Sequence, residues 1–400
     1  MLTFDVKYYI YIMKKWELKL HHQETNLKGI MTSISYSPSG DLIVAGMSNG
    51  NILFFERRLD GSWSNIQSST IKANTDKVDL SMQCLANPSV VDTDFVPVQR
   101  KCPMLLTAGE KEVKLWFISD HLEPTAPPDF VPHGLEFPPV YRSERLLTAN
   151  QVTSFESQYG MKFSSVRCCP DGMNFAYCES KNVSIRRVDR INPSLMVYHS
   201  DSELTKLDYH PNENEIILIG DASGRANIVD MRVQPTQSTP NLRANASHLL
   251  ANRFNYVNDC KFSADGTKFF TRHYSDLIFW DSRRTGNCLK KVPIKHDSES
   301  NDAHITTDGR DVFRSTWIDP KTVATGSFGG TLFLINTDGV ITPKYITQTE
   351  QKESKFLLTQ KARMSFAKEH QVNAIAISPN MNRLVASNTR SIQIYDLNAF

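Results

Sequence analysis

Apolar and polar positions alternate in a repeating unit that occurs about seven times along the 400-residue chain. Each copy has a short apolar strand, a turn rich in proline or glycine, a second strand, a polar turn and a third strand. The third strand ends in an aromatic residue followed by Asp, as in residues 277–281 (LIFWD), or in a degenerate form of that pair. Repeated four-stranded units with this ending are typical of a β-propeller. The pattern therefore predicts an all-β, seven-bladed propeller of the WD-repeat type.

The candidate blades follow one another at irregular spacing. They cover residues 31–57, 92–117, 164–186, 204–230, 257–281, 315–335 and 372–396. An early strand at residues 16–20 is expected to complete the final blade and close the ring, which removes exposed sheet edges. We therefore expect one propeller over residues 14–400, preceded by an N-terminal extension over residues 1–13 that need not be ordered.

Three inserts interrupt the blades, at residues 74–90, 120–145 and 294–311. The second is rich in proline and the third is acidic. Long insertions in a compact ring usually carry binding function, so we expect inserted hairpins or arms that contact partners. Disordered decoration is the alternative for each insert.

The balance of charge argues against a nucleic-acid or membrane partner. The chain has 45 basic and 43 acidic residues, for a formal net charge of +2, so no global field attracts a polyanion. It has neither a secretory signal pattern nor an apolar run of membrane-spanning length. These features predict a cytoplasmic protein, with the nucleus as an additional location.

Catalytic motifs are missing from the sequence. It contains no G-x-S-x-G, H-E-x-x-H, Walker loop or G-x-G-x-x-G, so no catalytic residue, cofactor or metal site is expected. The seven cysteines form no C-x-x-C and are expected to be small buried hydrophobes. A redox or metal role for the adjacent Cys168 and Cys169, and a hydrolase assembled from distant residues, remain as alternatives.

The polar turns between second and third strands should lie together on one face of the ring. Such a mixed polar and aromatic surface suits a peptide or a protein loop. The alternative for each of these turn residues is that it is solvated and contacts no partner. The candidate contact residues in these turns are Glu110, Glu179, Arg272, Tyr274 and Phe328.

Four segments, in order, carry a resemblance to a known family. They are residues 105–119, 209–211 with 229–232, 269–281 (FFTRHYSDLIFWD) and 323–328. Together they resemble the 55-kDa WD-repeat family of regulatory B subunits of protein phosphatase 2A. The resemblance extends over nearly the whole chain and is that of a divergent member.

The resemblance implies a non-catalytic regulatory or targeting subunit. Its partners would be the scaffold (A) and catalytic (C) subunits of the phosphatase and phosphoprotein substrates, with no cofactor of its own. The family's scaffold-binding arm corresponds to residues 120–145, in which the candidates are Asp120, Phe130, Phe137 and Tyr141. The family's substrate face adds Asp79, in the first insert, to the turn residues named above.

Three departures from the family pattern bear on substrate choice. The family has an adjacent acidic pair where this chain has Glu179 and Ser180, and its arm is charged where residues 120–145 are proline-rich. The segment before Leu204 is also shorter. A generic WD-repeat scaffold in another protein assembly is the alternative function.

Overall fold

The computed structural model describes the chain in segments. These are residues 16–24, 27, 29–58, 61–65, 70–74, 78–79, 84–85, 88–97, 103–122, 145–157, 161–189, 194–232, 242–243, 256–285, 288–294, 313–327, 330–345, 371–388 and 391–399. Strands and turns make up these segments, and none of them contains a helix.

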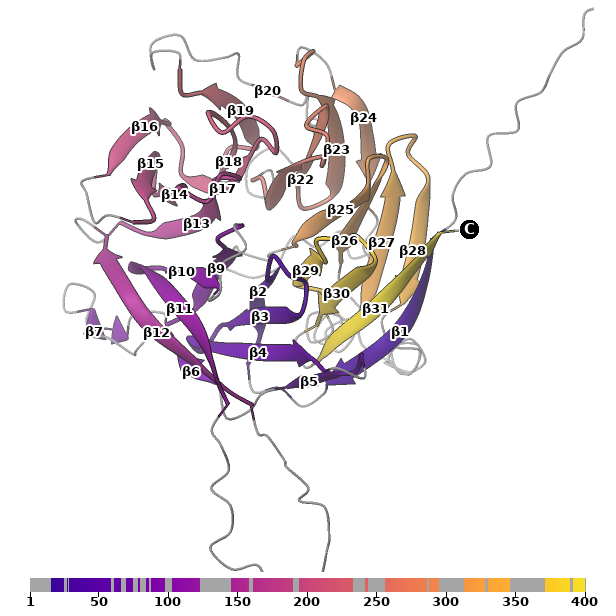
Figure 1. Cartoon of the computed structure of the whole chain (residues 1–400). Helices are drawn as coiled ribbons and strands as arrows, with labels where there is room; N and C mark the ends of the chain where they lie inside the picture. Colours follow the sequence, from indigo (N-terminus) through magenta and orange to yellow (C-terminus); the bar gives the residue numbers. More distant parts are fainter. Residues whose placement is uncertain are drawn as a thin grey trace, which may run out of the picture.

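Seven four-stranded antiparallel blades form a ring (Figure 1). We call the region around the axis of this ring, where the innermost strands of the blades meet, the central channel. Blades 1 and 2 are built from β2 (Met31–Tyr36), β3 (Leu42–Met47), β4 (Asn51–Arg57) and β5 (Trp63–Asn65), and from β9 (Val90–Phe95), β10 (Met104–Gly109), β11 (Glu112–Leu122) and β12 (Arg145–Glu156). Blades 3 and 4 are built from β13 (Phe163–Cys168), β14 (Asn174–Glu179), β15 (Asn182–Arg187) and β16 (Leu195–His199), and from β17 (Leu204–Tyr209), β18 (Ile216–Asp221), β19 (Arg225–Asp230) and β20 (Leu242–Arg243).

The remaining blades repeat the same order. Blades 5 and 6 are built from β21 (Asp259–Phe262), β22 (Lys268–Arg272), β23 (Asp276–Asp281) and β24 (Cys288–Pro293), and from β25 (Ser315–Asp319), β26 (Thr322–Gly326), β27 (Thr331–Asn336) and β28 (Ile341–Tyr345). Blade 7 is built from β29 (Ala374–Ile377), β30 (Arg383–Ser387), β31 (Ile392–Ala399) and β1 (Trp16–Glu24). The predicted seven-bladed β-propeller is confirmed.

Three short strands lie outside this plan. β6 (Ile71–Lys72) pairs with β4, while β7 (Val78–Asp79) and β8 (Cys84–Leu85) form a small hairpin of their own. β7 and β8 fall within the first predicted insert, residues 74–90, whereas β6 lies just before it.

The ring is closed by β1, the first strand that the structure describes. β1 pairs antiparallel with β31, in a register that runs from Trp16 opposite Ala399 to Glu24 opposite Ile392. The predicted closure by an early strand is therefore confirmed, and the strand is longer than residues 16–20. Each blade consequently has a neighbour on both sides.

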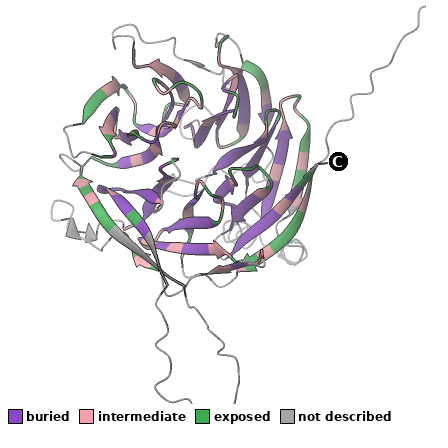
Figure 2. Ribbon diagram, viewed as in Figure 1, coloured by how far each residue is buried: buried purple, intermediate pink, exposed green. Residues whose placement is uncertain are grey.

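The hydrophobic core lies between the blades. Figure 2 shows buried residues concentrated in the inner strands and exposed ones at the outer strands. Val44 and Phe54 of blade 1 pack with Leu105 and Trp116 of blade 2, and the other clusters likewise combine neighbouring blades. Since every blade buries both faces, inner and middle strands such as β3 and β10 are buried at every position.

Cysteines fill small sites in this core. Cys168, Cys169, Cys178 and Cys260 are buried, whereas Cys288 is exposed on β24. Burial raises the pKa of the Cys168 thiol and raises that of Cys169 to about 12. Because only a thiolate attacks disulfides or binds metals, these high pKa values favour a structural role for the adjacent pair.

Candidate partner-binding surfaces

The turns between second and third strands lie where the sequence places them. Together with the links between blades they form one face of the ring, which we call the turn face. Glu110 lies between β10 and β11, Glu179 ends β14, Arg272 ends β22 and Tyr274 lies between β22 and β23. Phe328 lies outside the described residues.

Glu110 is held by a neighbouring link rather than displayed freely. Only 9% of the residue is exposed, and its Oε2 lies 3.0 Å from Nζ of the half-exposed Lys162. The Glu110 carbonyl also accepts the backbone N–H of Phe163 at 3.0 Å. Glu110 thus ties blade 2 to blade 3, and an incoming basic group would compete with Lys162 for its carboxylate.

Glu179 is a more open acid. It is half-buried at the end of β14 and is followed by Ser180, whose backbone φ is 52°, and by the exposed Lys181. The left-handed φ lets the chain reverse direction here, so Ser180 and Lys181 form a tight turn between Glu179 and its strand partner Asn182. The local charge is mixed, because Lys181 lies two residues after Glu179.

Arg272 does not belong to an open surface, and its expected display on the turn face is wrong. Its side chain is 0% exposed. Nη1 donates to the backbone carbonyls of His273 and Tyr274, and Nε donates to Thr325 Oγ1 of blade 6 at 3.0 Å. Burial lowers the pKa of the Arg272 guanidinium to about 9. The side chain joins blade 5 to blade 6.

Tyr274 packs beside this arginine. Its half-buried ring lies 6.1 Å from the buried ring of Phe313, and the Arg272 guanidinium lies 5.0 Å from the same phenyl ring. Of the predicted turn residues, Glu179 and Tyr274 therefore retain accessible area, on separate blades.

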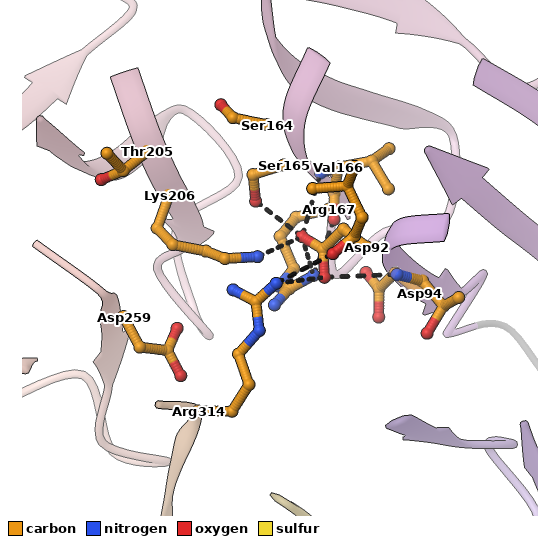
Figure 3. Close-up of polar contacts among 12 residues, drawn as sticks. Asp92, Asp94, Ser164, Ser165, Val166, Arg167, Thr205, Lys206, Asp259 and Arg314 are labelled. Carbon is orange, nitrogen blue, oxygen red and sulfur yellow. Dashed lines mark hydrogen bonds and ion pairs between the residues drawn. The ribbon is translucent and has the colours of Figure 1, made fainter. Parts of the chain in front are cut away.

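A charged network that the sequence reasoning missed crosses the central channel (Figure 3). Asp92 of β9 is its hub. Its Oδ2 accepts hydrogen bonds from Ser165 Oγ at 2.8 Å, Arg167 Nη1 at 3.0 Å and Lys206 Nζ at 2.7 Å. Arg314 reaches across from blade 6, with Nη2 3.9 Å from Asp92 Oδ1 and 2.9 Å from the carbonyl of Val91. Side chains from blades 2, 3, 4 and 6 thus meet at one carboxylate.

Other aspartates satisfy backbone groups of the innermost strands. Such a strand has a free edge on the channel, where an N–H has no strand partner. Asp94 accepts the N–H of Cys168 at 2.7 Å, Asp208 that of Phe262 at 2.9 Å and Asp259 that of Ser315 at 2.7 Å. Each carboxylate belongs to one blade and each amide to the next. These bonds fasten successive blades at the channel.

The channel carboxylates differ in protonation. Burial alone would raise the pKa of Asp92, but Arg167, Arg314 and the hydrogen bond from Ser165 hold it below its usual range. Burial raises the pKa of Asp94 to about 6 and that of Asp208 to about 7, against a partial opposing effect of Arg167. Asp92 is therefore the firmly ionised member of the group.

A signal for this network was present in the sequence. Asp92 in the first strand of blade 2 (VVDTDF) and Lys206 in that of blade 4 (LTKLDY) are charged residues among buried apolar positions. A charge within such a strand has to meet a partner where the strand is buried. Its partners come from other blades, so the signal indicates a buried pair without identifying it.

A ribbon projects from blade 2 at the position of the predicted arm. β11 and β12 pair from Glu112 opposite Glu156 to Leu122 opposite Arg145, whereas β10 pairs with β11 only as far as Phe117. The last residue pairs of this ribbon therefore lie beyond the blade, as Figure 1 shows. Asp120 lies in it, opposite Leu147. Phe130, Phe137 and Tyr141 lie outside the described residues.

Asp79, the predicted site residue of the first insert, lies in the β7–β8 hairpin, with its backbone opposite Cys84. Within the described segments, no group of His, Cys, Asp and Glu side chains could hold a metal ion. No helix in that part of the chain is long and apolar enough to cross a membrane.

Comparison with known proteins is consistent with this class of fold. Residues 17–56 match the WD domain, G-beta repeat family. The match begins in β1 and ends in β4, so one sequence repeat joins the outer strand of blade 7 to three strands of blade 1. The chain is a propeller that contains a WD repeat.

More specific similarities are distant. The chain is 19% identical, over 69% of its length and 69% of the relative's, to the beta isoform of the 55 kDa regulatory B-type subunit of serine/threonine-protein phosphatase 2A from Carassius auratus. It is 18% identical, over 75% of its length and 68% of the relative's, to the serine/threonine-protein phosphatase 2A regulatory subunit sur-6 of Caenorhabditis elegans. Both relatives are named as regulatory subunits.

Proposed function

We propose that this chain is a non-catalytic regulatory subunit of a protein phosphatase 2A type holoenzyme. It binds the scaffold subunit through the arm and presents phosphoprotein substrates to the catalytic subunit from its turn face. The β11–β12 ribbon carries the proposal, since it extends beyond blade 2 where the arm is expected. The two relatives, both named as phosphatase 2A regulatory subunits, support it.

The mechanism is tethering. A substrate held on the propeller reaches the separate active site at a high effective concentration, without any chemistry by the propeller. Acidic groups on the turn face, chiefly Glu179, steer substrates with basic stretches. The proposal includes a location in the cytoplasm or nucleus, which microscopy of a tagged chain would test.

The test of assembly removes the arm and keeps the blade. Leu122 and Arg145 are opposite each other, so residues 123–144 can be replaced by Asn-Gly, a dipeptide that favours a two-residue hairpin turn. We expect the intact chain to co-elute with the scaffold and catalytic subunits on size exclusion, and the shortened chain to elute alone with an unchanged Tm. A matched control replaces residues 296–310, in another predicted insert, by a short Gly/Ser linker and should still assemble.

The two components of the proposal can fail separately. If the shortened chain still assembles, the arm does not bind the scaffold subunit. No complex with the intact, folded chain would leave the propeller and favour a generic WD-repeat scaffold in another assembly.

Substrate choice is tested at Glu179. A Glu179→Lys variant should bind a basic phosphopeptide about fivefold to tenfold more weakly and still enter the complex, because charge reversal opposes steering. Glu215→Lys makes the same charge change at an exposed turn on the opposite face and should bind normally. Equal peptide affinities for the Glu179 variant and the unmodified chain would contradict the assignment.

A further inference from the structure

A groove of about 340 Å³ lies between blades 4 and 5, on the face opposite the turn face. Its walls come from the turn after β17, the turn after β21 and the residues that follow β23. All three segments lie at the ends of the strands far from the turn face. This volume is within the range of sites that bind small ligands or single side chains of a peptide.

The floor of the groove is apolar. It is formed by Ile216, Ile228 and Phe262, of which the two isoleucines are partly exposed. The Phe262 ring meets the His210 ring edge to face, with 4.9 Å between centroids and 70° between planes. An apolar side chain that entered here would cover surface that now faces water.

Most polar groups of the walls are already engaged within the chain. His210 Nε2 lies 3.2 Å from the carbonyl of Gly266, and Asp265 Oδ1 accepts from Ser263 Oγ at 2.5 Å. Glu213 lies 3.4 Å from Arg232. These contacts hold the two walls in place and engage the carboxylates of Asp265 and Glu213 within the chain.

Arg283 is the exception. Its backbone N–H donates to Asp281 Oδ1 at 2.8 Å, and its exposed guanidinium has no hydrogen-bond or ion-pair partner among the described residues. An arginine offers five donors in a planar fork that suits a carboxylate. A free cation therefore stands beside an apolar floor.

We propose that this groove binds an extended peptide of a partner protein. An apolar side chain of the peptide enters the groove, and an adjacent Asp or Glu pairs with Arg283. Residues 233–255, which follow blade 4 in the chain, contain no Asp or Glu, so this neighbouring segment lacks the required carboxylate. The proposal does not depend on the phosphatase assignment, because the groove lies on the other face of the ring from the substrate-presenting turns.

The test uses a phage-displayed random heptapeptide library panned on the full chain, followed by synthesis of the enriched peptides. We expect enriched sequences to place Asp or Glu next to Leu, Ile, Val or Phe. Arg283→Glu should weaken their binding about tenfold, because a matched pair becomes a like-charge pair. Arg284→Glu is the matched control. It changes a neighbouring exposed arginine that does not line the groove, and it should leave the affinity within about twofold.

Several outcomes would overturn the proposal. They are the absence of enrichment, enriched peptides without an acidic residue, and equal binding to the Arg283→Glu variant. A dimer in solution that Arg283→Glu dissociates would assign the groove to a second copy instead. Phosphatase assembly of the Arg283→Glu variant is measured alongside, so that failure of the groove and failure of the holoenzyme proposal give different results.

Discussion

The central channel and the groove between blades 4 and 5 contain the same kinds of residue and use them differently. In the channel, Arg167 and Lys206 both donate to Asp92, so the buried charges are paired within the chain. In the groove, the guanidinium of Arg283 has no such partner in the described part of the chain. Charge alone therefore does not indicate a binding surface, and the proposed groove differs from the channel in leaving hydrogen-bonding capacity unused.

A difference in exposure divides the turn face. Arg272 and Glu179 both end a second strand, and the sequence predicts the same role for both. The buried Arg272 guanidinium donates hydrogen bonds to backbone carbonyls and to Thr325, whereas part of the Glu179 side chain is exposed to water. Their shared position in the repeat therefore does not give them a shared function.

Removal of the channel hub should have the largest effect. Asp92→Ala leaves Arg167 and Lys206 buried without their counter-charge, and breaking a buried pair in this way costs about 3–5 kcal/mol of unfolding free energy. Urea unfolding measures the loss. Ser165→Ala, which deletes one hydrogen bond to the same carboxylate, should cost only about 1 kcal/mol. If both variants lose the same small free energy of unfolding, the channel charges are not held by Asp92 and the contrast with the groove fails.

The pH dependence of stability tests the aspartates that accept backbone N–H groups of the next blade at the channel. Burial raises the pKa of Asp208 in the folded protein to about 7, from an ordinary value of 3.8. The folded state therefore takes up a proton as the pH falls through 7, while the unfolded state does so only near 4. The wild-type chain should consequently gain about 2 kcal/mol relative to Asp208→Asn between pH 8 and pH 5. Parallel pH profiles of the two proteins would show that Asp208 titrates normally.

Removal of a buried threonine hydroxyl should cost less unfolding free energy, and the same contact can be tested in two blades. Thr271 accepts the indole N–H of Trp280 at 3.1 Å in blade 5, and Thr107 accepts that of Trp116 at 2.9 Å in blade 2. Each change to valine leaves a buried donor unpaired, so each should cost about 1.5 kcal/mol in chemical denaturation. A large loss at one threonine and none at the other would contradict their equivalence.

The smallest expected effect on stability is at the groove. Arg283→Glu should change the free energy of unfolding by no more than about 0.5 kcal/mol, because the exposed side chain has no partner to lose among the residues that the structure describes. Thermal unfolding of this variant beside the unmodified chain is the measurement. A loss above about 1 kcal/mol would show that Arg283 is structural, like the channel cations.

The architecture was predictable because its signals are local. Alternating apolar positions, Pro and Gly turns and the strand near Trp16 each occupy a few adjacent residues, and the ring follows from their repetition. The outer strands were not predicted, because β16 and β24 are largely exposed and lack a buried pattern. The charged network was not predicted either, since Asp92 and Arg314 are 222 residues apart in the sequence.

The candidate site was predictable in position and less so in accessibility. The turns, and an insert at residues 120–145, follow from spacing, and the ribbon of β11 and β12 occupies both ends of that insert. Burial depends instead on what packs above a residue. Phe313 covers Arg272 from a segment about 40 residues further along the chain, which no local pattern around Arg272 records.

Closure of the ring by β1 and β31 has a consequence for the order of folding. Six of the seven blades pair strands that are consecutive in the chain, whereas blade 7 joins Trp16 to Ala399. The entropy lost on closing a loop grows with the logarithm of its length, and such distant pairings slow folding. During synthesis β1 emerges before the blades that follow it and cannot pair with β31 until β31 has left the ribosome. We expect the amides of β1 to be the last of the ring to gain protection in pulse-labelled hydrogen exchange.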